Sequence, residues 1–228
     1  NGSNDGIDEI IVKKFPEVKF IKNRENTGFA KGYNRAINFT KGEFILMLNS
    51  DIEILPGSIS TLLKEAKKRK DVVLVGKLLL TDGSVQNSCF KLPTITGAIK
   101  EYFFNRKNEY RMYHPKGNTP TEVEGAVMAN YLIPRSIWNK IGELSENSFM
   151  YFEDIEYCKR LKKAGFKIYC CPNAKFIHHH GASSKKIGER SYEYLKKGAA
   201  LYHGRIKYLI LCFILWLGQK ISSSQKTP

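Results

Sequence analysis

The chain has 228 residues, enough to bury a sizeable core in one large domain or in one domain with a tail. Its 37 Lys and Arg against 22 Asp and Glu give a net charge of +15, which favours an anionic partner: a nucleic acid, an anionic membrane surface or a substrate such as a nucleotide. The five cysteines are scattered without a C-x-x-C pair, so the sequence argues against a zinc site and a disulfide framework, and free thiols fit a reducing cytoplasm.

Helices and strands alternate in the first third of the chain. Apolar residues recur at helical spacing before Pro16, in 29–39 before Gly42, and again in 59–70. Short apolar runs predict strands at 18–21, 44–49, 72–75 and 77–80. Short alternating units of this kind predict an α/β fold, with a mostly parallel sheet flanked by crossover helices.

The pattern dissolves between residues 90 and 122, where aromatic and basic residues mix. Two interpretations stay open here: a long insertion over a pocket, which we favour, and a strip that stacks on single-stranded nucleic acid. Order returns with small residues at 124–128, a short helix at 134–142 and a helix at 153–164 closed by Gly165. Strands are predicted at 167–170 and 174–178, separated by a turn at Pro172-Asn173.

The C-terminal part predicts one or two helices between residues 192 and 217. The run 206–217 is apolar apart from Lys207 and is too short to span a bilayer, which needs about 20 apolar residues. It is therefore either a buried helix or an interfacial anchor, and neighbouring Lys and Arg favour an anionic membrane face. We expect a helical tail over 186–221 and disorder over 222–228.

The strand at 44–49 organises the rest of the chain. It reads as buried on both faces, and it ends in Asn49-Ser50-Asp51. Ligands of open α/β sheets bind beyond the carboxyl ends of the strands, so Asp51 stands where a metal ion or a phosphorylated ligand would lie. The alternative is that Asp51 only starts a turn.

Two further polar clusters stand at the ends of predicted elements, Glu153-Asp154 and His178. Oxygen ligands with one imidazole suit Mn²⁺ or Mg²⁺ better than zinc, so Asp51 and His178 could hold a divalent ion and, through it, a diphosphate. Glu153 or Asp154 could accept a proton from an attacking hydroxyl. The alternatives are that the two acids only start a helix and that the histidines form a solvated turn or a metal-scavenging tract.

Several stretches together resemble the inverting GT-A glycosyltransferases of family 2, in particular their rhamnosyltransferase-like branch. They follow the family order over roughly residues 1–185: Asn1 to Gly6, Asn26 to Asn34, Leu48 to Asp51, Gly125-Ala126, Phe152 to Glu156 with Arg160-Leu161, and His178 with Gly181 and Ser183.

The resemblance implies a role for each motif. Asn49-Ser50-Asp51 looks like the DxD-type motif, with Asn in place of the first Asp, and His178 looks like the metal-binding histidine. The implied donor contacts are Asn26, Gly28, Asn34, Asn49 and Asp51. Gly125 and Ala126 fall on the acceptor side, and Asp154, beside Glu153, looks like the catalytic base. The implied reaction is attack by an acceptor hydroxyl on the anomeric carbon, with inversion and departure of a nucleoside diphosphate.

The resemblance also implies a dTDP- or UDP-sugar donor and a saccharide or lipid-linked acceptor. The basic surface and the apolar tail favour a cytoplasmic enzyme that is peripheral at the inner face of the membrane. Family members begin with a strand-helix-strand segment that this chain lacks. We therefore expect residues 1–185 to be a truncated GT-A domain that binds donor poorly without an upstream extension. A non-catalytic remnant that binds a sugar or a partner is the alternative. We expect no nucleic-acid partner, because no helix gathers the basic residues into one recognition face.

Overall fold

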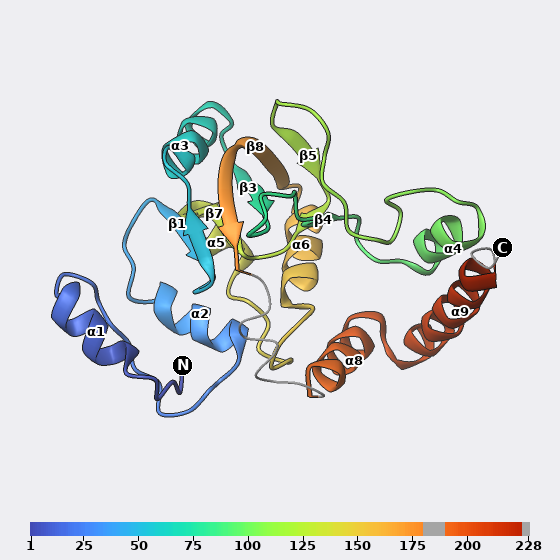
Figure 1. Ribbon diagram of the computed structural model, residues 1–228, viewed down its shortest axis with the longest axis horizontal. Helices are drawn as coiled ribbons and strands as arrows, with labels where there is room; N and C mark the ends of the chain where they lie inside the picture. Colours follow the sequence, from blue (N-terminus) through green and yellow to red (C-terminus); the bar gives the residue numbers. More distant parts are fainter. Residues whose placement is uncertain (180–189, 225–228) are drawn as a thin grey trace.

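The structure is a computed structural model that describes residues 1–179 and 190–224. A six-stranded sheet forms its centre (Figure 1). Its strands run in the order β1 (Phe44–Leu48), β7 (Asn130–Pro134), β3 (Val72–Leu79), β8 (Lys167–His178) and β2 (Ile52–Ile54), and β5 (Thr121–Val123) pairs with β8. A two-stranded ladder joins β4 (Cys89–Phe90) to β6 (Gly125–Ala126).

The sheet is mixed. β3 and β8 pair in parallel, and β1 runs in the same direction because β1 and β3 each pair antiparallel with β7. The carboxyl ends of β1, β3 and β8 therefore point the same way, with β7 inserted between β1 and β3. This arrangement confirms the predicted α/β sheet with flanking helices and shows that an antiparallel strand interrupts its parallel part.

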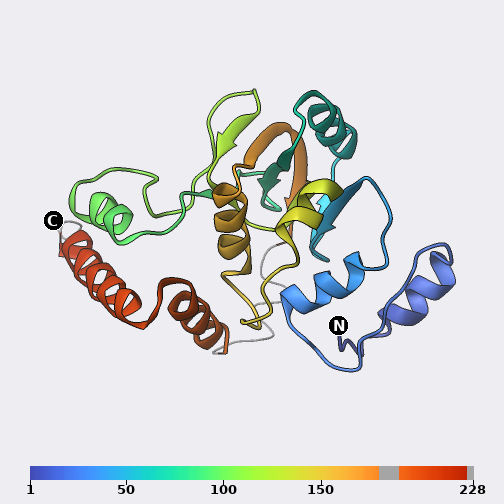
Figure 2. The same cartoon turned by 180° about the vertical axis from the view of Figure 1, so that it is seen from behind.

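Helices cover both faces of the sheet (Figures 1 and 2). One face packs on α3 (Ser58–Lys68), and the other packs on α2 (Phe29–Ile37), α5 (Arg135–Ile141) and α6 (Glu153–Lys163). Alternate residues of β1 pack into two apolar cores, one on each face of the sheet. Ile45 and Met47 belong to the core with α2 and α6, whereas Leu46 packs against the core with α3. A strand buried on both faces needs apolar residues at every position, which is why its sequence is a continuous apolar run.

Three strand predictions were wrong in detail. Residues 18–21 form no strand. The two predicted strands at 72–80 are one strand, β3, and those at 167–178 are one strand, β8. The expected turn at Pro172-Asn173 is an irregularity inside β8, because the register with β3 jumps from Cys171 to Lys175 between Gly76 and Lys77.

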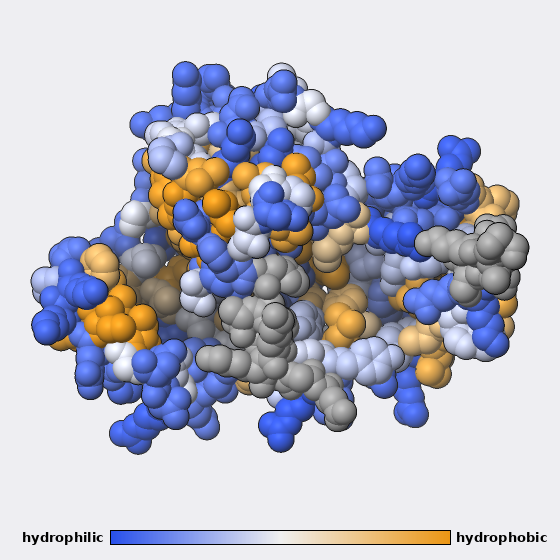
Figure 3. All heavy atoms as spheres, viewed as in Figure 1, coloured by the Kyte–Doolittle hydropathy of each residue, from blue (hydrophilic) through white to orange (hydrophobic). Residues whose placement is uncertain are grey.

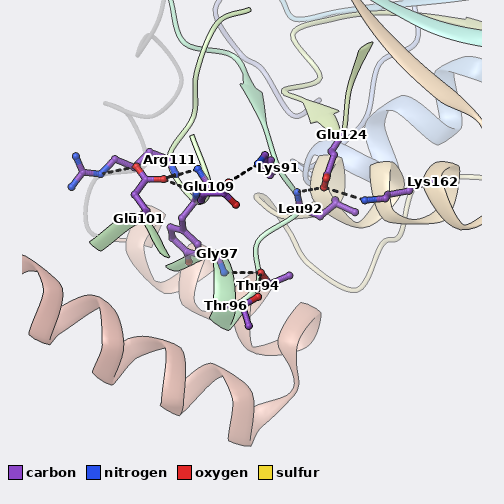
Figure 4. Close-up of polar contacts among 11 residues, drawn as sticks. Lys91, Leu92, Thr94, Thr96, Gly97, Glu101, Glu109, Arg111, Glu124 and Lys162 are labelled. Carbon is purple, nitrogen blue, oxygen red and sulfur yellow. Dashed lines mark hydrogen bonds and ion pairs between the residues drawn. The ribbon is translucent and has the colours of Figure 1, made fainter. Parts of the chain in front are cut away.

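The stretch from 90 to 122 is more ordered than we expected, because it contains α4 (Ile95–Phe103). The Thr94 hydroxyl caps this helix by accepting a hydrogen bond from the Gly97 N–H, at 3.0 Å. The loop after α4 is fixed by the Glu101 carboxylate, which accepts backbone hydrogen bonds from residues 109, 110 and 111 (Figure 4).

The C-terminal region is helical, as predicted, and forms two helices, α8 (Arg190–His203) and α9 (Arg205–Ser224). α9 packs along α4 through Leu211 and through Gly218, whose position leaves room for the Tyr102 ring. It continues to Ser224, so it extends into the segment 222–228 that we expected to be disordered. No helix among the described residues is long and apolar enough to cross a membrane. At the other end of the molecule, α1 (Ile7–Lys14) has no buried residue.

Candidate active site

A tight turn after β1 presents the first polar cluster. The Ile52 N–H donates to the Asn49 carbonyl at 3.2 Å, and the Asn49 N–H donates to the Ala129 carbonyl at 3.1 Å. The Tyr33 hydroxyl donates to the Leu48 carbonyl at 2.6 Å and lies 3.2 Å from Asn49 Oδ1. Burial and the nearby Asp51 carboxylate raise the pKa of Tyr33 well above its ordinary value, so this hydroxyl keeps its proton and holds the turn. Tyr33 lies in the Asn26 to Asn34 stretch of the family resemblance, but the sequence gave no sign that its hydroxyl holds this turn.

The turn brings Asp51 to His178. β2 pairs antiparallel with β8, so Ile52 lies opposite His178, and the His179 N–H donates to the Asp51 carbonyl at 2.8 Å. The carboxylate Oδ1 of Asp51 is 3.3 Å from Nε2 of His178, and both side chains are largely buried. Two residues 127 positions apart in the chain therefore meet, as the metal-site prediction required.

The second ring nitrogen of His178 contacts a residue that the sequence gave no reason to select. Nδ1 lies 2.9 Å from Oε1 of Gln86, which follows the turn after β3. The Gln86 amide oxygen accepts this hydrogen bond from Nδ1, and Nε2 is the ring nitrogen that faces Asp51. Gln86 thus orients the imidazole as an outer partner orients a metal-ligating histidine. The only signal for Gln86 is spatial, because it lies 92 positions before His178.

The facing carboxylate oxygen and imidazole nitrogen fit a shared divalent cation. Neighbouring ligands of an octahedral ion, each about 2.1 Å from the metal, lie about 3 Å apart, close to the observed 3.3 Å. Across residues 1–179 and 190–224 no cluster of three or more His, Cys, Asp or Glu could hold a metal. Within those ranges, the candidate metal site thus has two protein ligands, Asp51 and His178. Gly181 and Ser183, which belong to the same sequence motif as His178, lie outside the described residues.

Glu153 and Asp154 open helix α6, as predicted, but they are not ordinary solvated helix-starting acids. Glu153 is buried, and its Oε2 has no hydrogen-bond partner among the described residues. Burial, together with the Asp154 charge, raises the pKa of Glu153 to about 8. Burial also raises the pKa of Asp154 to about 6, although Asp154 Oδ1 accepts a hydrogen bond from the Ile155 N–H. At neutral pH the pair is therefore one protonated and one ionised carboxyl, an arrangement suited to proton transfer.

A strained turn holds this acid pair. Tyr151 and Phe152 both have left-handed backbone conformations, with φ of 72° and 71°, which bulky residues rarely adopt. Helix α8 packs on this turn, because a Cβ on Gly198 would come within 2.8 Å of the Tyr151 carbonyl oxygen. The Phe152 ring also contacts Tyr202, at 5.7 Å between ring centroids. Helix α8 thus supports the turn that positions the Glu153 and Asp154 side chains.

The acid pair and the Asp51 turn lie at the same edge of the sheet. β7 begins at Asn130, opposite Leu48, the last residue of β1. The next residue, Tyr131, places its hydroxyl 3.1 Å from Cys158, one helical turn beyond Asp154 in α6. Figure 1 shows the same relation, with the N-terminus of α6 and the carboxyl ends of β1 and β8 on one side.

The predicted donor residues before α2 form a bonded loop. Asn26 Oδ1 accepts hydrogen bonds from the Asn1 side-chain amide and the Gly28 N–H. Gly28 has φ of 87°, and a Cβ there would lie 2.4 Å from the Phe149 carbonyl oxygen. This glycine therefore permits a close approach between the loop and the segment that leads to the acid pair.

Asn34 contacts a different segment, residues 144–146. Its buried amide bonds to both backbone groups of Leu144 and to the Glu146 carboxylate, all at 2.9 Å. It also borders a cavity of about 300 Å³ on α2, whose lining includes none of Asp51, Glu153, Asp154 and His178. In this structure Asn34 positions the 144–146 segment, and its predicted donor contact stays a prediction.

Gly125 and Ala126 form β6, a buried strand against which α6 packs. A Cβ on Gly125 would lie 2.2 Å from the Phe90 ring, so the glycine is needed for packing. These contacts indicate that β6 supports helix α6, which carries the acid pair. A direct contact of Gly125 or Ala126 with an acceptor stays a prediction.

Known proteins resemble this chain in sequence and fold. A family model described as "Glycosyl transferase family 2" matches residues 1–141. A protein of Mycobacterium tuberculosis named N-acetylglucosaminyl-diphospho-decaprenol L-rhamnosyltransferase is 29% identical over 205 residues, which cover 81% of this chain and 66% of the relative. Rhamnosyltransferase WbbL of Escherichia coli K12 is 22% identical over 191 residues, 80% of this chain and 72% of the relative.

The low-salt glycan biosynthesis hexosyltransferase Agl10 of Haloferax volcanii is 25% identical over 181 residues, 78% of this chain and 56% of the relative. The chain thus spans slightly under two thirds of the mycobacterial relative and just over half of the archaeal one. Among solved structures, GalNAc-T7 with UDP, GalNAc and Mn²⁺ superposes with a TM-score of 0.56 at 14% identity, covering 78% of this chain and 35% of that one. This likeness supports a GT-A-like fold. Because the family model covers well over half of the sequence, the chain belongs to glycosyl transferase family 2.

Proposed function

We propose that this site transfers a sugar from a nucleoside-diphosphate sugar to an acceptor hydroxyl, with inversion at the anomeric carbon. The observation that carries the proposal is the pairing of Asp51 with His178 at the sheet edge that also carries Glu153 and Asp154. One cluster suits a diphosphate leaving group and the other suits deprotonation of an attacking hydroxyl.

Asp154 is the proposed general base. With a pKa of about 6 it is ionised at neutral pH and still basic enough to take a proton from a hydroxyl as the hydroxyl oxygen attacks. In the same step the bond between the anomeric carbon and the diphosphate oxygen breaks, so attack and departure occur on opposite faces and the configuration inverts. Glu153, with a pKa of about 8, keeps its proton at neutral pH and can donate a hydrogen bond to a ligand oxygen.

Asp51 and His178 are the proposed holders of a Mn²⁺ or Mg²⁺ ion, and Gln86 fixes the imidazole for this role. When bound, such an ion neutralises negative charge on the departing diphosphate. Tyr33 holds the Asn49–Asp51 turn in place through the Leu48 carbonyl. Asn26 and Gly28 shape the loop proposed to contact the donor.

The names of the relatives motivate the proposed substrates. Two are named as rhamnosyltransferases, one of them for a diphospho-decaprenol acceptor. We therefore propose a dTDP- or UDP-sugar as donor, with dTDP-rhamnose first among them. The proposed acceptor is a saccharide, carried on a lipid diphosphate, in the synthesis of a cell-surface polysaccharide.

Release of nucleoside diphosphate tests the proposal. UDP- and dTDP-sugars are incubated with Mn²⁺ or Mg²⁺ and lipid-linked saccharide acceptors. The chain is tested both alone and with an upstream extension, because residues 1–185 are expected to bind donor poorly without one, and Asp51→Ala and Asp154→Asn are tested beside it. We expect metal-dependent release that Asp51→Ala abolishes. Asp154→Asn should lower transfer to the acceptor by about 10²- to 10⁴-fold, because it removes the base, while donor binding measured by calorimetry stays. The matched control is Glu53→Gln, an exposed carboxylate two residues from Asp51, which should change little.

The pH profile adds a second readout. Transfer should rise through pH 6 as Asp154 ionises, and Asp154→Asn should remove that limb. Absence of both nucleotide release and donor-dependent heat with every donor would refute the proposal.

A further inference from the structure

The outward side of α9 is apolar although the helix already packs on the protein with its other side. The inward side carries Leu211 and Gly218, which are buried against α4. The outward side, here called the outer face of α9, carries Ile206, Leu209, Ile210, Phe213 and Trp216. These residues recur at intervals of three and four, so they line one face, and Ile206 and Phe213 are 76% and 61% exposed. Figure 3 shows apolar atoms along this end of the molecule.

The helices next to this face are rich in basic residues. The segment 190–224 contains six Lys and Arg residues and one acidic residue, Glu193. Lys220 lies over the ring of Trp216, 4.2 Å from its centroid, and Lys196 lies over the ring of Tyr192 at the same distance. Aromatic rings beside ammonium groups, on an exposed apolar helix with an excess of positive charge, have the composition of helices that lie in a bilayer interface.

The helix that carries this face is anchored firmly. α9 rests on α4, and the loop after α4 is held by the Glu101 carboxylate (Figure 4). Lys91 pairs with Glu109 of the same loop at 2.8 Å. Closer to the sheet, Glu124 accepts the Leu92 N–H and pairs with Lys162 of α6. These contacts hold α4 and its loop in place, and α4 in turn holds α9 with its outer face exposed.

We propose that the outer face of α9, with the basic residues of α8 and α9, is a docking surface for an anionic lipid bilayer. α9 lies in the plane of the interface, with Phe213 and Trp216 at the level of the acyl chains and the Lys and Arg side chains on anionic headgroups. Charge selects this occupant, because an anionic bilayer complements both the apolar face and the excess of positive charge in residues 190–224. A second copy of the chain would bring two positive surfaces together.

The docked position has a consequence for the acceptor, which rests on the proposed function. α8 leads directly into α9 and also packs on Tyr151 and Phe152, the turn before Glu153 and Asp154. Only α8 separates α9 from the turn before the acid pair. A bilayer that binds α9 would therefore lie close to Glu153 and Asp154. This geometry favours an acceptor sugar presented on a lipid diphosphate at the membrane surface over a freely diffusing saccharide.

Vesicle binding tests the docking surface without any need for activity. The chain is mixed with phosphatidylcholine vesicles that contain either no anionic lipid or 30% phosphatidylglycerol, as a chosen composition, and binding is measured by flotation at low and high salt. We expect binding to the anionic vesicles only, weakened by salt. Brominated lipids should quench Trp216, whereas Trp138 is buried in the core and should not respond.

Substitutions on the outer face locate the contact. The Phe213 side chain is exposed, so Phe213→Glu should not disturb folding. This substitution should lower vesicle binding at least tenfold, because it places a charge in the apolar face. Lys196→Gln with Lys197→Gln should lower binding to anionic vesicles by about tenfold. The matched control is Val12→Glu on α1, an equally exposed apolar residue at the far end of the molecule, which should leave binding unchanged.

Two results would overturn the proposal. One is equal binding of wild type and Phe213→Glu to anionic vesicles. The other is absence of vesicle binding together with a dimer in light scattering that Phe213→Glu converts to a monomer, because the face would then be a self-association surface. Release of nucleoside diphosphate from the donor in the presence of a soluble acceptor, measured on the same preparations, reports the proposed function separately.

Discussion

Replacing Glu153 by glutamine should stabilise the protein, and increasingly so as the pH rises. The Glu153 carboxyl is buried with Oε2 unpartnered among the described residues, and its pKa is raised from an ordinary 4.5 to about 8. Below pH 4.5 both the folded and the unfolded chain carry the proton, so burial of the ionised form costs nothing. Above that pH the unfolded chain ionises while the folded chain stays protonated, and stability falls until the pH passes about 8.

The size of the effect follows from these two pKa values. Each pH unit between them lowers the free energy of unfolding by about 1.36 kcal/mol, so the penalty is about 3 kcal/mol at pH 7 and about 5 kcal/mol above pH 8. Glutamine has nearly the same shape and never ionises. Glu153→Gln should therefore equal wild type within about 1 kcal/mol at pH 5 and exceed it by several kcal/mol at pH 8.

Urea unfolding at pH 5, 6, 7 and 8 measures this difference. The control is Glu17→Gln, an exposed carboxylate on the N-terminal segment, whose difference from wild type should stay small and independent of pH. A constant gap between wild type and Glu153→Gln across the pH range would refute the reasoning, since it would mean that Glu153 ionises alike in the folded and unfolded states.

Two other substitutions test the supports of the site. Gln86→Leu should weaken Mn²⁺ binding, measured by calorimetry or by the Mn²⁺ spin-resonance signal, by about 10- to 100-fold because His178 loses its orienting partner, and unchanged affinity would contradict the role given to Gln86. Gly28→Ala should lower the free energy of unfolding by more than 2 kcal/mol, because its Cβ would meet the Phe149 carbonyl at 2.4 Å and its φ is 87°. Gly57→Ala, with φ of 80° and open space around the position, should cost only about 1 kcal/mol, and equal losses in thermal melts would show that the Phe149 contact is unimportant.

Local patterns in the sequence were enough to predict several elements of this protein. The apolar run before Asn49 predicted β1, because a strand covered on both faces has no position for a polar residue. Helical spacing predicted α1, α2, α3 and α6 close to their observed bounds, because one face of each must be apolar. Polar clusters at the ends of predicted elements indicated Asp51, Glu153-Asp154 and His178, and the family resemblance then indicated Asp154 as the base.

Contacts between distant residues depend on how the whole chain packs, and local patterns do not encode them. The insertion of β7 between β1 and β3 leaves no local mark, because an antiparallel partner is chosen by the whole sheet. The pairing of Gln86 with His178 depends on two strands that are far apart in the sequence. The raised pKa of Glu153 likewise comes from burial, and burial is a property of what packs around a residue. The same spacing pattern fits a buried helix and an interfacial one, so only the packing of α4 on one side of α9 distinguishes its covered face from its exposed one.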